Sequence, residues 1–182
     1  NRLRLNAAVY AMDRTNSQLD FSLITGTRNT LETVNAPGTT TIRGAELEGQ
    51  FQATENLRLS ASYTYTDAQV PDTANPFTSK VQEVFIVYTP KNAANVAADW
   101  EAPFMGATFK AHVDANYADA SHSFEQFSVK NDASFIVNGR VAIADIPTKP
   151  GGPALEVALW SRNLLDETFV YRRDPSNRPT FG

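Results

Sequence analysis

The sequence contains no cysteine and only two histidines. The absence of cysteine excludes a disulfide scaffold and a thiolate metal site. The sequence also lacks any run of about 18 apolar residues, so it offers no membrane-spanning helix. A basic surplus is missing too, because 16 Lys and Arg against 20 Asp and Glu give a formal charge of −4. We therefore expect no nucleic-acid partner.

What the sequence does contain is alternation of apolar and polar side chains over stretches of about ten residues. Residues 108–117, TFKAHVDANY, show it most plainly, with Phe109 and Val113 on one face of an extended strand and Lys110 and Asp114 on the other. Long segments with charged polar faces and oily faces rich in Ala, Leu, Val and aromatics are typical of a transmembrane β-barrel. The pattern predicts an all-β, antiparallel up-and-down meander of about seven long strands.

The expected strands are Arg2–Thr15, Leu31–Ala53, Leu57–Thr66, Val84–Glu101, Ala107–Tyr117, Val129–Ile143 and Ala154–Tyr171. The alternation of the first strand extends through Leu19, Phe21 and Leu23. Pro37-Gly38 interrupts the second strand and Pro90 the fourth, where we expect a break or a bulge. The assignment requires one face to meet hydrocarbon, and that face carries Leu59, Val113 and Val137.

Short connections alternate with longer ones along the chain. The short ones are Thr54–Asn56, Ala102–Gly106 and Pro147–Pro153, and the longer ones are Thr25–Asn35, Asp67–Val81 and Ala118–Lys130. Short turns at one rim and long loops at the other are the asymmetry of outer-membrane barrels. Aromatic residues gather toward strand ends, as an interfacial girdle would require: Phe51, Tyr65, Trp100, Phe104 and Tyr117.

These turns predict specific cross-strand neighbours. The expected pairs are Phe51 with Leu59 and Leu47 with Tyr63 on the outward face, Glu48 with Ser62 and Glu46 with Thr64 on the inward face, and Asp99 with Lys110 across the next hairpin.

Three segments resemble TonB-dependent outer-membrane receptors. Residues 44–68, GAELEGQFQATENLRLSASYTYTDA, resemble that family's G-x-E-x-E strand, short periplasmic turn and following strand. Residues 155–171, LEVALWSRNLLDETFVY, resemble the penultimate strand, and residues 89–100, TPKNAANVAADW, resemble a third family segment. Their order and spacing fit the C-terminal third of the family's barrel.

The resemblance implies a barrel of about 22 strands filled by an N-terminal plug domain, in the outer membrane of a Gram-negative bacterium. Such a receptor imports a scarce ligand, for example an iron–siderophore complex or cobalamin, with energy passed from TonB at the inner membrane. The implied partners are outer-membrane lipid and lipopolysaccharide, the plug, TonB and the ligand. On this basis we expect residues 1–182 to form a partial barrel domain, with the plug and the last strand outside the chain.

Ligand binding in this family depends on outer loops and plug, so we expect it in the outer loops, including the final loop after the last expected strand. The residues that we expect to contact the ligand are His122, Phe124, Phe127, Arg172 and Arg173. Together with Arg178, the two arginines suit an anionic ligand or lipopolysaccharide phosphates. The resemblance implies neither a cofactor nor enzymatic activity.

Several polar groupings have both a chemical and a structural interpretation. Glu46 and Glu48 share one strand face, as an acid–base pair would, but a water-facing barrel wall also contains such residues. His112 with Asp114 resembles a base and its orienting carboxylate, yet no nucleophile motif accompanies them. We therefore expect no catalytic residue.

Asp114, Asn116 and Asp119 offer oxygen ligands, but without the Gly and the distal Glu of a calcium loop. We expect no metal site. Two other classes of protein stay open: a soluble antiparallel β-sandwich or barrel that acts as a binding module, with the oily face buried, and an outer-membrane lipase, which needs Ser and His together at the lipid face.

Overall fold

The computed structural model describes residues 2–25, 27–174 and 179–181, and every regular element in these residues is a strand. The strands are β1 (Leu3–Thr15), β2 (Gln18–Thr25), β3 (Arg28–Asn35), β4 (Thr39–Gln52), β5 (Leu57–Gln69), β6 (Thr73–Ala74), β7 (Val81–Gln82), β8 (Asn92–Phe104), β9 (Ala107–Ala118), β10 (Ser134–Pro147), β11 (Ala154–Ser161), β12 (Val170–Arg173) and β13 (Pro179–Phe181). Across the described ranges, no helix has the length and apolar character needed to cross a membrane.

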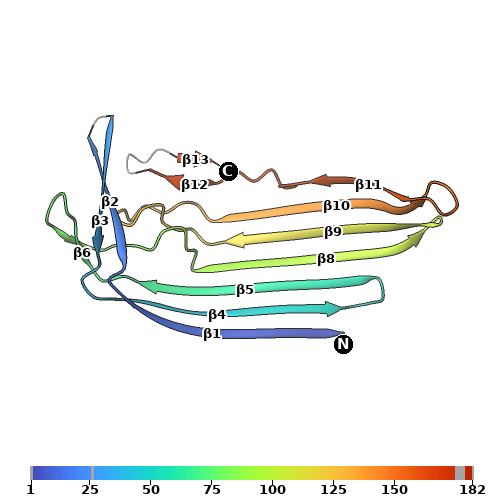
Figure 1. Ribbon diagram of the computed structural model, residues 1–182, viewed down its shortest axis with the longest axis horizontal. Helices are drawn as coiled ribbons and strands as arrows, with labels where there is room; N and C mark the ends of the chain where they lie inside the picture. Colours follow the sequence, from blue (N-terminus) through green and yellow to red (C-terminus); the bar gives the residue numbers. More distant parts are fainter. Residues whose placement is uncertain (1, 26, 175–178, 182) are drawn as a thin grey trace.

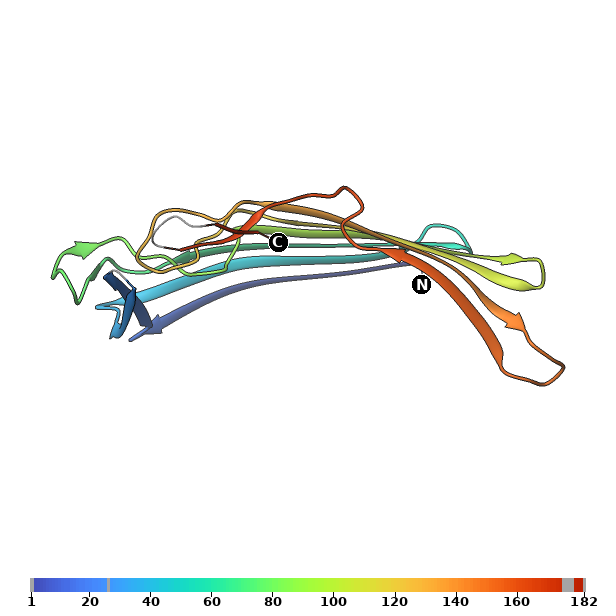
Figure 2. The ribbon, with the colours of Figure 1, turned by 90° about the horizontal axis from the view of Figure 1, so that it is seen from above.

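Seven long strands form one antiparallel sheet in the order β1-β4-β5-β8-β9-β10-β11 (Figure 1). Each strand pairs with the next long strand along the chain, so the predicted meander is confirmed. The small two-stranded sheets β2-β3 and β6-β7 lie at one end, and the short turns lie at the other. Figure 2 shows the long strands as a single curved layer, and within the described residues no second layer covers the sheet.

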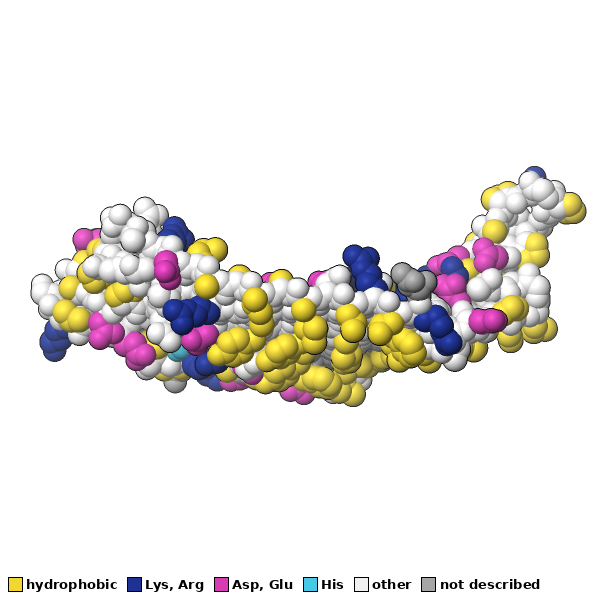
Figure 3. Space-filling view, turned by 90° about the horizontal axis from the view of Figure 1, so that it is seen from below, with side chains coloured by type: hydrophobic (Ala, Val, Ile, Leu, Met, Phe, Trp, Pro, Cys, Tyr) yellow, Lys and Arg dark blue, Asp and Glu magenta, His cyan; other side chains and the backbone are white. Residues whose placement is uncertain are grey.

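One face of this layer, the outward face, carries exposed apolar side chains. Leu59 is 39% exposed and Val113 45% exposed, and Val137 is partly exposed. The exposed apolar residues of this face, which we call the apolar band, are Leu3, Leu5, Val9, Leu47, Phe51, Leu59, Tyr63, Val96, Trp100, Val113, Tyr117, Phe135, Val141, Val157 and Leu159. Figure 3 shows hydrophobic side chains gathered along the middle of the sheet, with charged side chains toward both ends. A soluble sandwich would have buried this face.

The opposite, inward face is polar, and several of its charges are paired. Arg58 contacts Asp99 at 3.3 Å, and Arg140 pairs with Glu156. The His112 Nδ1 lies 2.8 Å from Asp99. Opposite charges on neighbouring strands stabilise this wall, whereas like charges directly opposite each other would destabilise it.

The β4-β5 hairpin has the predicted register. The structure pairs Phe51 with Leu59, Leu47 with Tyr63, Glu48 with Ser62 and Glu46 with Thr64. The connection is braced by Thr54, whose Oγ1 accepts hydrogen bonds from the Asn56 and Leu57 amides at 3.2 and 3.0 Å.

The β8-β9 hairpin corrects a predicted pair. Its turn consists of Met105 and Gly106 alone, with φ of 50° and 80°, rather than residues 102–106. Two consecutive positive φ angles are typical of a type I′ turn, which closes a hairpin with only two residues. Glu101 therefore pairs with Lys110, and Asp99 pairs with His112 rather than with Lys110.

At the loop end, the chain folds back earlier than predicted. The first strand does not continue through Leu19, Phe21 and Leu23, because the chain turns at Asn16 (φ 54°) and starts a separate hairpin. In this hairpin β2 pairs with β3, so the predicted strand Leu31–Ala53 is two strands and the predicted loop Thr25–Asn35 is largely strand.

Three further strand bounds differ from prediction. β8 begins at Asn92, not Val84, consistent with the interruption that Pro90 causes. β10 is displaced toward the turn end relative to the predicted Val129–Ile143. The seventh strand breaks after Ser161 and resumes as β12, although Leu164 still donates its amide to the Val137 carbonyl at 2.7 Å. The chain thus follows β10 past the break.

Candidate functional site

The long connections pack together into one structure at the loop end. We call it the loop cluster: the β2-β3 hairpin, residues 70–91 and residues 119–133. Its core is formed by Leu19, Phe21, Ala36 and Val84, with Val34, Val70 and Phe77 packed against them. Phe21 is fully buried. Leu19 and Phe21 of β2 therefore hold loops together instead of extending the apolar face of β1, which is why the alternation misassigned them.

Gln126 joins the three parts of the cluster. Its amide group donates to the Ser22 carbonyl at 2.9 Å and accepts from the Ser22 amide at 2.5 Å. Its own carbonyl accepts a hydrogen bond from the Gln82 side chain at 3.0 Å. Because buried main-chain groups need partners, this side chain takes the place of a neighbouring strand beside β2.

A polar pocket of 460 Å³ lies between the loops and the outer end of β5. His122 lines it, with its ring stacked on Phe85 at 3.9 Å between centroids. Lys91 also lines the pocket and pairs with Asp67 at 3.3 Å. Other charged lining residues are Asp72, Glu83 and Lys130. Charges of both signs make this pocket suited to a polar ligand.

The folded environment shifts the pKa values of three side chains in residues 119–133. Burial, followed by the charge of Lys130, lowers the pKa of His122. Burial also raises the pKa of the Glu125 carboxyl. A hydrogen bond from the Val170 amide, followed by one from Arg173, lowers the pKa of Asp132. The imidazole of His122 is therefore held toward its neutral form, in which it stacks and can accept a hydrogen bond.

Phe124, Phe127 and Arg172 form a second surface. The two rings meet edge to face at 6.0 Å, and the Arg172 guanidinium lies 5.3 Å from the Phe124 ring centroid. Guanidinium groups over aromatic rings gain cation–π attraction and leave their donors free for a ligand. Three of the predicted ligand residues are thus brought together, whereas the pocket of His122 includes neither phenylalanine.

Arg173, unlike Arg172, makes hydrogen bonds and an ion pair within the fold. Its guanidinium contacts Asp132 at 3.0 Å and donates to the Lys130 carbonyl at 3.1 Å. Its amide donates to the Ser123 hydroxyl at 3.1 Å. These bonds fasten β12 to residues 123–132, so the side chain is committed to the fold. Arg178 lies outside the described residues.

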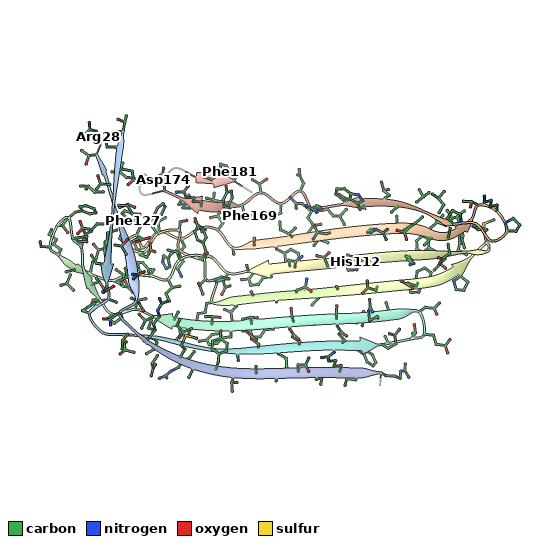
Figure 4. All side chains as sticks on the ribbon, viewed as in Figure 1. Arg28, His112, Phe127, Phe169, Asp174 and Phe181 are labelled. Atoms are coloured by element: carbon green, nitrogen blue, oxygen red, sulfur yellow. The ribbon has the colours of Figure 1, made fainter. Side chains whose placement is uncertain are left out.

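The inward carboxylates support the interpretation as a barrel wall. Glu48 borders a polar groove of 270 Å³ together with Arg4, Asn6 and Ser62. His112 does lie between two carboxylates, at 2.8 Å from Asp99 and 3.3 Å from Asp114. In Figure 4 it lies in the middle of the sheet, away from Phe127 at the loop end. Its inward position removes it from the lipid face, where a lipase would need it.

Asp114 and Asp119, two of the oxygen ligands considered for calcium, make hydrogen bonds on different faces of the sheet. Asp114 accepts hydrogen bonds from Asn116 and from Asn138 on the inward face. Asp119 accepts instead from the hydroxyl of Tyr117, which belongs to the outward face. In the described ranges, no group of three His, Cys, Asp or Glu side chains could hold a metal ion.

Sequence reasoning missed Phe85, Lys91 and Gln126. Phe85 sits in a run, VFIV, that reads as strand, and only the folded loops bring it to His122. Lys91 follows Pro90, so a loop position was the available signal. Gln126 carries no sequence signal, because its partner Ser22 is 104 positions away.

Comparisons with known proteins agree with this geometry. The family model described as TonB dependent receptor-like, beta-barrel, matches residues 1–164. Among solved structures, the copper transporter OprC is similar at 15% identity and a TM-score of 0.69, over 100% of this chain and 27% of OprC. The ferric-catecholate import receptor Fiu from K12 E. coli, in its closed form, is similar at 18% identity and a TM-score of 0.66, over 100% of this chain and 24% of Fiu.

The chain thus spans about a quarter of the length of either solved structure, at 27% and 24%. A comparison with curated proteins finds no match. At these identities the two structures establish the fold, and the family model establishes the relationship. The chain belongs to the TonB-dependent receptor family, as part of its β-barrel.

Proposed function

We propose that the chain forms part of the barrel wall of an outer-membrane uptake receptor in a Gram-negative bacterium, which imports a scarce small ligand with energy from TonB. The observation that carries this proposal is the uncovered sheet, with the apolar band on one face and a polar surface with several ion pairs on the other. Hydrocarbon on one side and a wet lumen on the other is the environment that such a sheet requires.

The inward face supports a plug domain as a partner. A polar groove bordered by Arg4, Asn6, Glu48 and Ser62 offers donors and acceptors to a polar surface inside the barrel. Both the plug and TonB belong to the proposal through family membership. It includes no catalytic step.

For the ligand, we propose an anionic, aromatic iron complex of the catecholate kind. A guanidinium beside two phenylalanine rings at the loop end suits a ligand that combines negative charge with aromatic faces. Fiu, a similar structure, is a ferric-catecholate import receptor. OprC is a copper transporter, but a guanidinium and two phenylalanine rings are not the soft or imidazole ligands that copper prefers.

Binding of a radiolabelled ferric tris-catecholate to cells that display the whole receptor tests this proposal. We expect Phe124→Ala and Arg172→Ala to weaken binding by about tenfold, the equivalent of one good contact. Arg28→Ala is the matched control, because Arg28 lies at the tip of the β2-β3 hairpin, away from Phe127 (Figure 4). Binding of cupric ion in place of the iron complex, or equal binding by all variants, would contradict the ligand assignment.

A further inference from the structure

The apolar band is not smooth. A groove of 540 Å³ opens in it across four strands, from β8 to β11. Small residues form its floor, since Ala98, Ala111 and Gly139 lie on the outward face of three neighbouring strands. Larger side chains form its walls: Trp100, Leu159 and Leu164.

Leu164 reaches the groove because of the break after β11. Its main chain bonds to Val137, and its side chain lies over Gly139, where a Cβ would approach Leu164 Cδ1 to 2.9 Å. A glycine at this position lets Leu164 form the wall without collision. The groove is therefore shaped by the fold, and is not a gap left by chance between small side chains.

The lining offers almost nothing polar to a ligand. The Ser161 hydroxyl is the polar side chain that the register places on this face, opposite Gly139. His112, Arg140 and Trp160 also border the groove, but the register turns their side chains inward. Small-molecule sites usually carry a few placed polar groups, so a groove of this size without them suits a hydrocarbon chain.

The groove has a defined depth in the membrane. Trp100, at its end, meets Phe109 edge to face at 5.5 Å, and Phe109 meets Phe104 at 6.5 Å. These three rings lie beside the Met105-Gly106 turn, on the short-turn rim. Aromatic clusters mark the boundary between acyl chains and headgroups, and short turns mark the periplasmic side.

We propose that this groove is a binding site for one acyl chain of a phospholipid in the periplasmic leaflet, with the headgroup beside the Trp100–Phe109–Phe104 cluster. The proposal rests on the outer-membrane location given under the proposed function. It commits to phospholipid because the groove opens at the periplasmic boundary, whereas lipopolysaccharide occupies the opposite leaflet. An acyl chain is the expected occupant because the groove is continuous with the apolar band, and under the proposed function hydrocarbon covers that band.

Native mass spectrometry of the whole receptor in mild detergent, after incubation with phosphatidylethanolamine vesicles, tests the site. The double variant Ala98→Leu with Ala111→Leu fills the floor and keeps the surface apolar, so insertion and folding are preserved. Ala94→Leu with Ala115→Leu is the matched control, on the same strands and face but outside the lining. We expect retained phospholipid to fall about tenfold in the filled variant and to stay at the wild-type amount in the control.

Equal retention by the filled variant and the wild type would overturn the groove site and leave the membrane location intact. Lipid A retained in place of phospholipid would overturn the assignment to the periplasmic leaflet. A wild-type protein recovered in the soluble fraction without detergent would instead refute the proposed function. A shift in gel mobility on heating verifies that each variant is folded.

Discussion

At the scale of single residues, Tyr10 packs closely against Gly44 on the inward face. The tyrosine ring crosses over the glycine, and its hydroxyl lies 3.1 Å from the Thr66 hydroxyl, two strands away from β1. A Cβ on Gly44 would overlap the end of this ring and lie 2.5 Å from the Tyr65 carbonyl oxygen. One glycine thus allows a side chain to connect three strands.

We expect Gly44→Ala to lower the free energy of unfolding by about 1–3 kcal/mol, the usual cost of overpacking. Heat-induced unfolding followed by gel mobility measures the change. Gly49→Ala is the control, because its Cβ would meet only the flexible end of Leu5, at 3.1 Å. Equal losses in both variants would show that Tyr10 does not set the cost.

His122 gives the loop cluster a dependence on pH. Its pKa is lowered in the folded loop by burial and then by Lys130, so the folded loop binds the proton less readily than an open loop does. Stability from this residue is full above the ordinary histidine pKa of about 6.5 and is lost as the pH falls below it. Glu125, whose pKa is raised by burial, acts in the opposite direction.

Hydrogen exchange of residues 119–133, corrected for intrinsic rates, checks this prediction. We expect protection to decrease as the pH falls from about 7.5 to 5.5, the range in which histidine titrates. His122→Phe keeps the stacking on Phe85 and removes the histidine titration, so its protection should no longer decrease as the pH falls; Glu125 alone would increase it. A variant that loses protection as the wild type does would rule out His122 as the cause.

At the scale of elements, the β8-β9 hairpin carries a local strain. Met105 adopts φ of 50°, a conformation that costs an ordinary side chain roughly 1–2 kcal/mol and suits glycine or asparagine. We expect Met105→Asn to raise the free energy of unfolding by up to about 1 kcal/mol. Denaturant unfolding in detergent measures it. Gly106→Val, at φ of 80°, should have the opposite effect.

The strands that were predicted best from sequence are those whose two faces lie in different environments, one apolar and one polar. Alternation located β5 and β9 and fixed the β4-β5 register, because a one-residue slip would move Leu59 from lipid to lumen. The same alternation misassigned β2. Leu19 and Phe21 lie on one face of this strand because that face packs in the core of the loop cluster. The connection predicted at Ala102–Gly106 was too long, because nothing in the side chain of methionine signals the positive φ that lets Met105 and Gly106 close the hairpin alone.

The loop cluster shows the limit of that reasoning at the scale of the whole molecule. Phe124 and Phe127 were predicted from their place in a long connection and Arg172 from its place near the final loop, and the structure brings the three together. Arg173 carries the same charge as Arg172 but is committed to Asp132. Sequence distinguishes loops from strands. Which of two neighbouring arginines is bound to the fold depends on contacts between distant segments, because Asp132 and Arg173 are 41 positions apart.

An arginine introduced on either face of the sheet should distinguish the environments of the two faces. Val113 belongs to the apolar band at mid-sheet, and Ala97 belongs to the inward face of the neighbouring strand, opposite Asp114. We expect Val113→Arg to destabilise the protein in lipid vesicles by roughly 2–4 kcal/mol, the cost of arginine at the bilayer midplane. Ala97→Arg should cost far less, because water and Asp114 surround the new charge. Unfolding by guanidinium in vesicles measures both, and equal costs would mean that lipid does not cover the face of Val113.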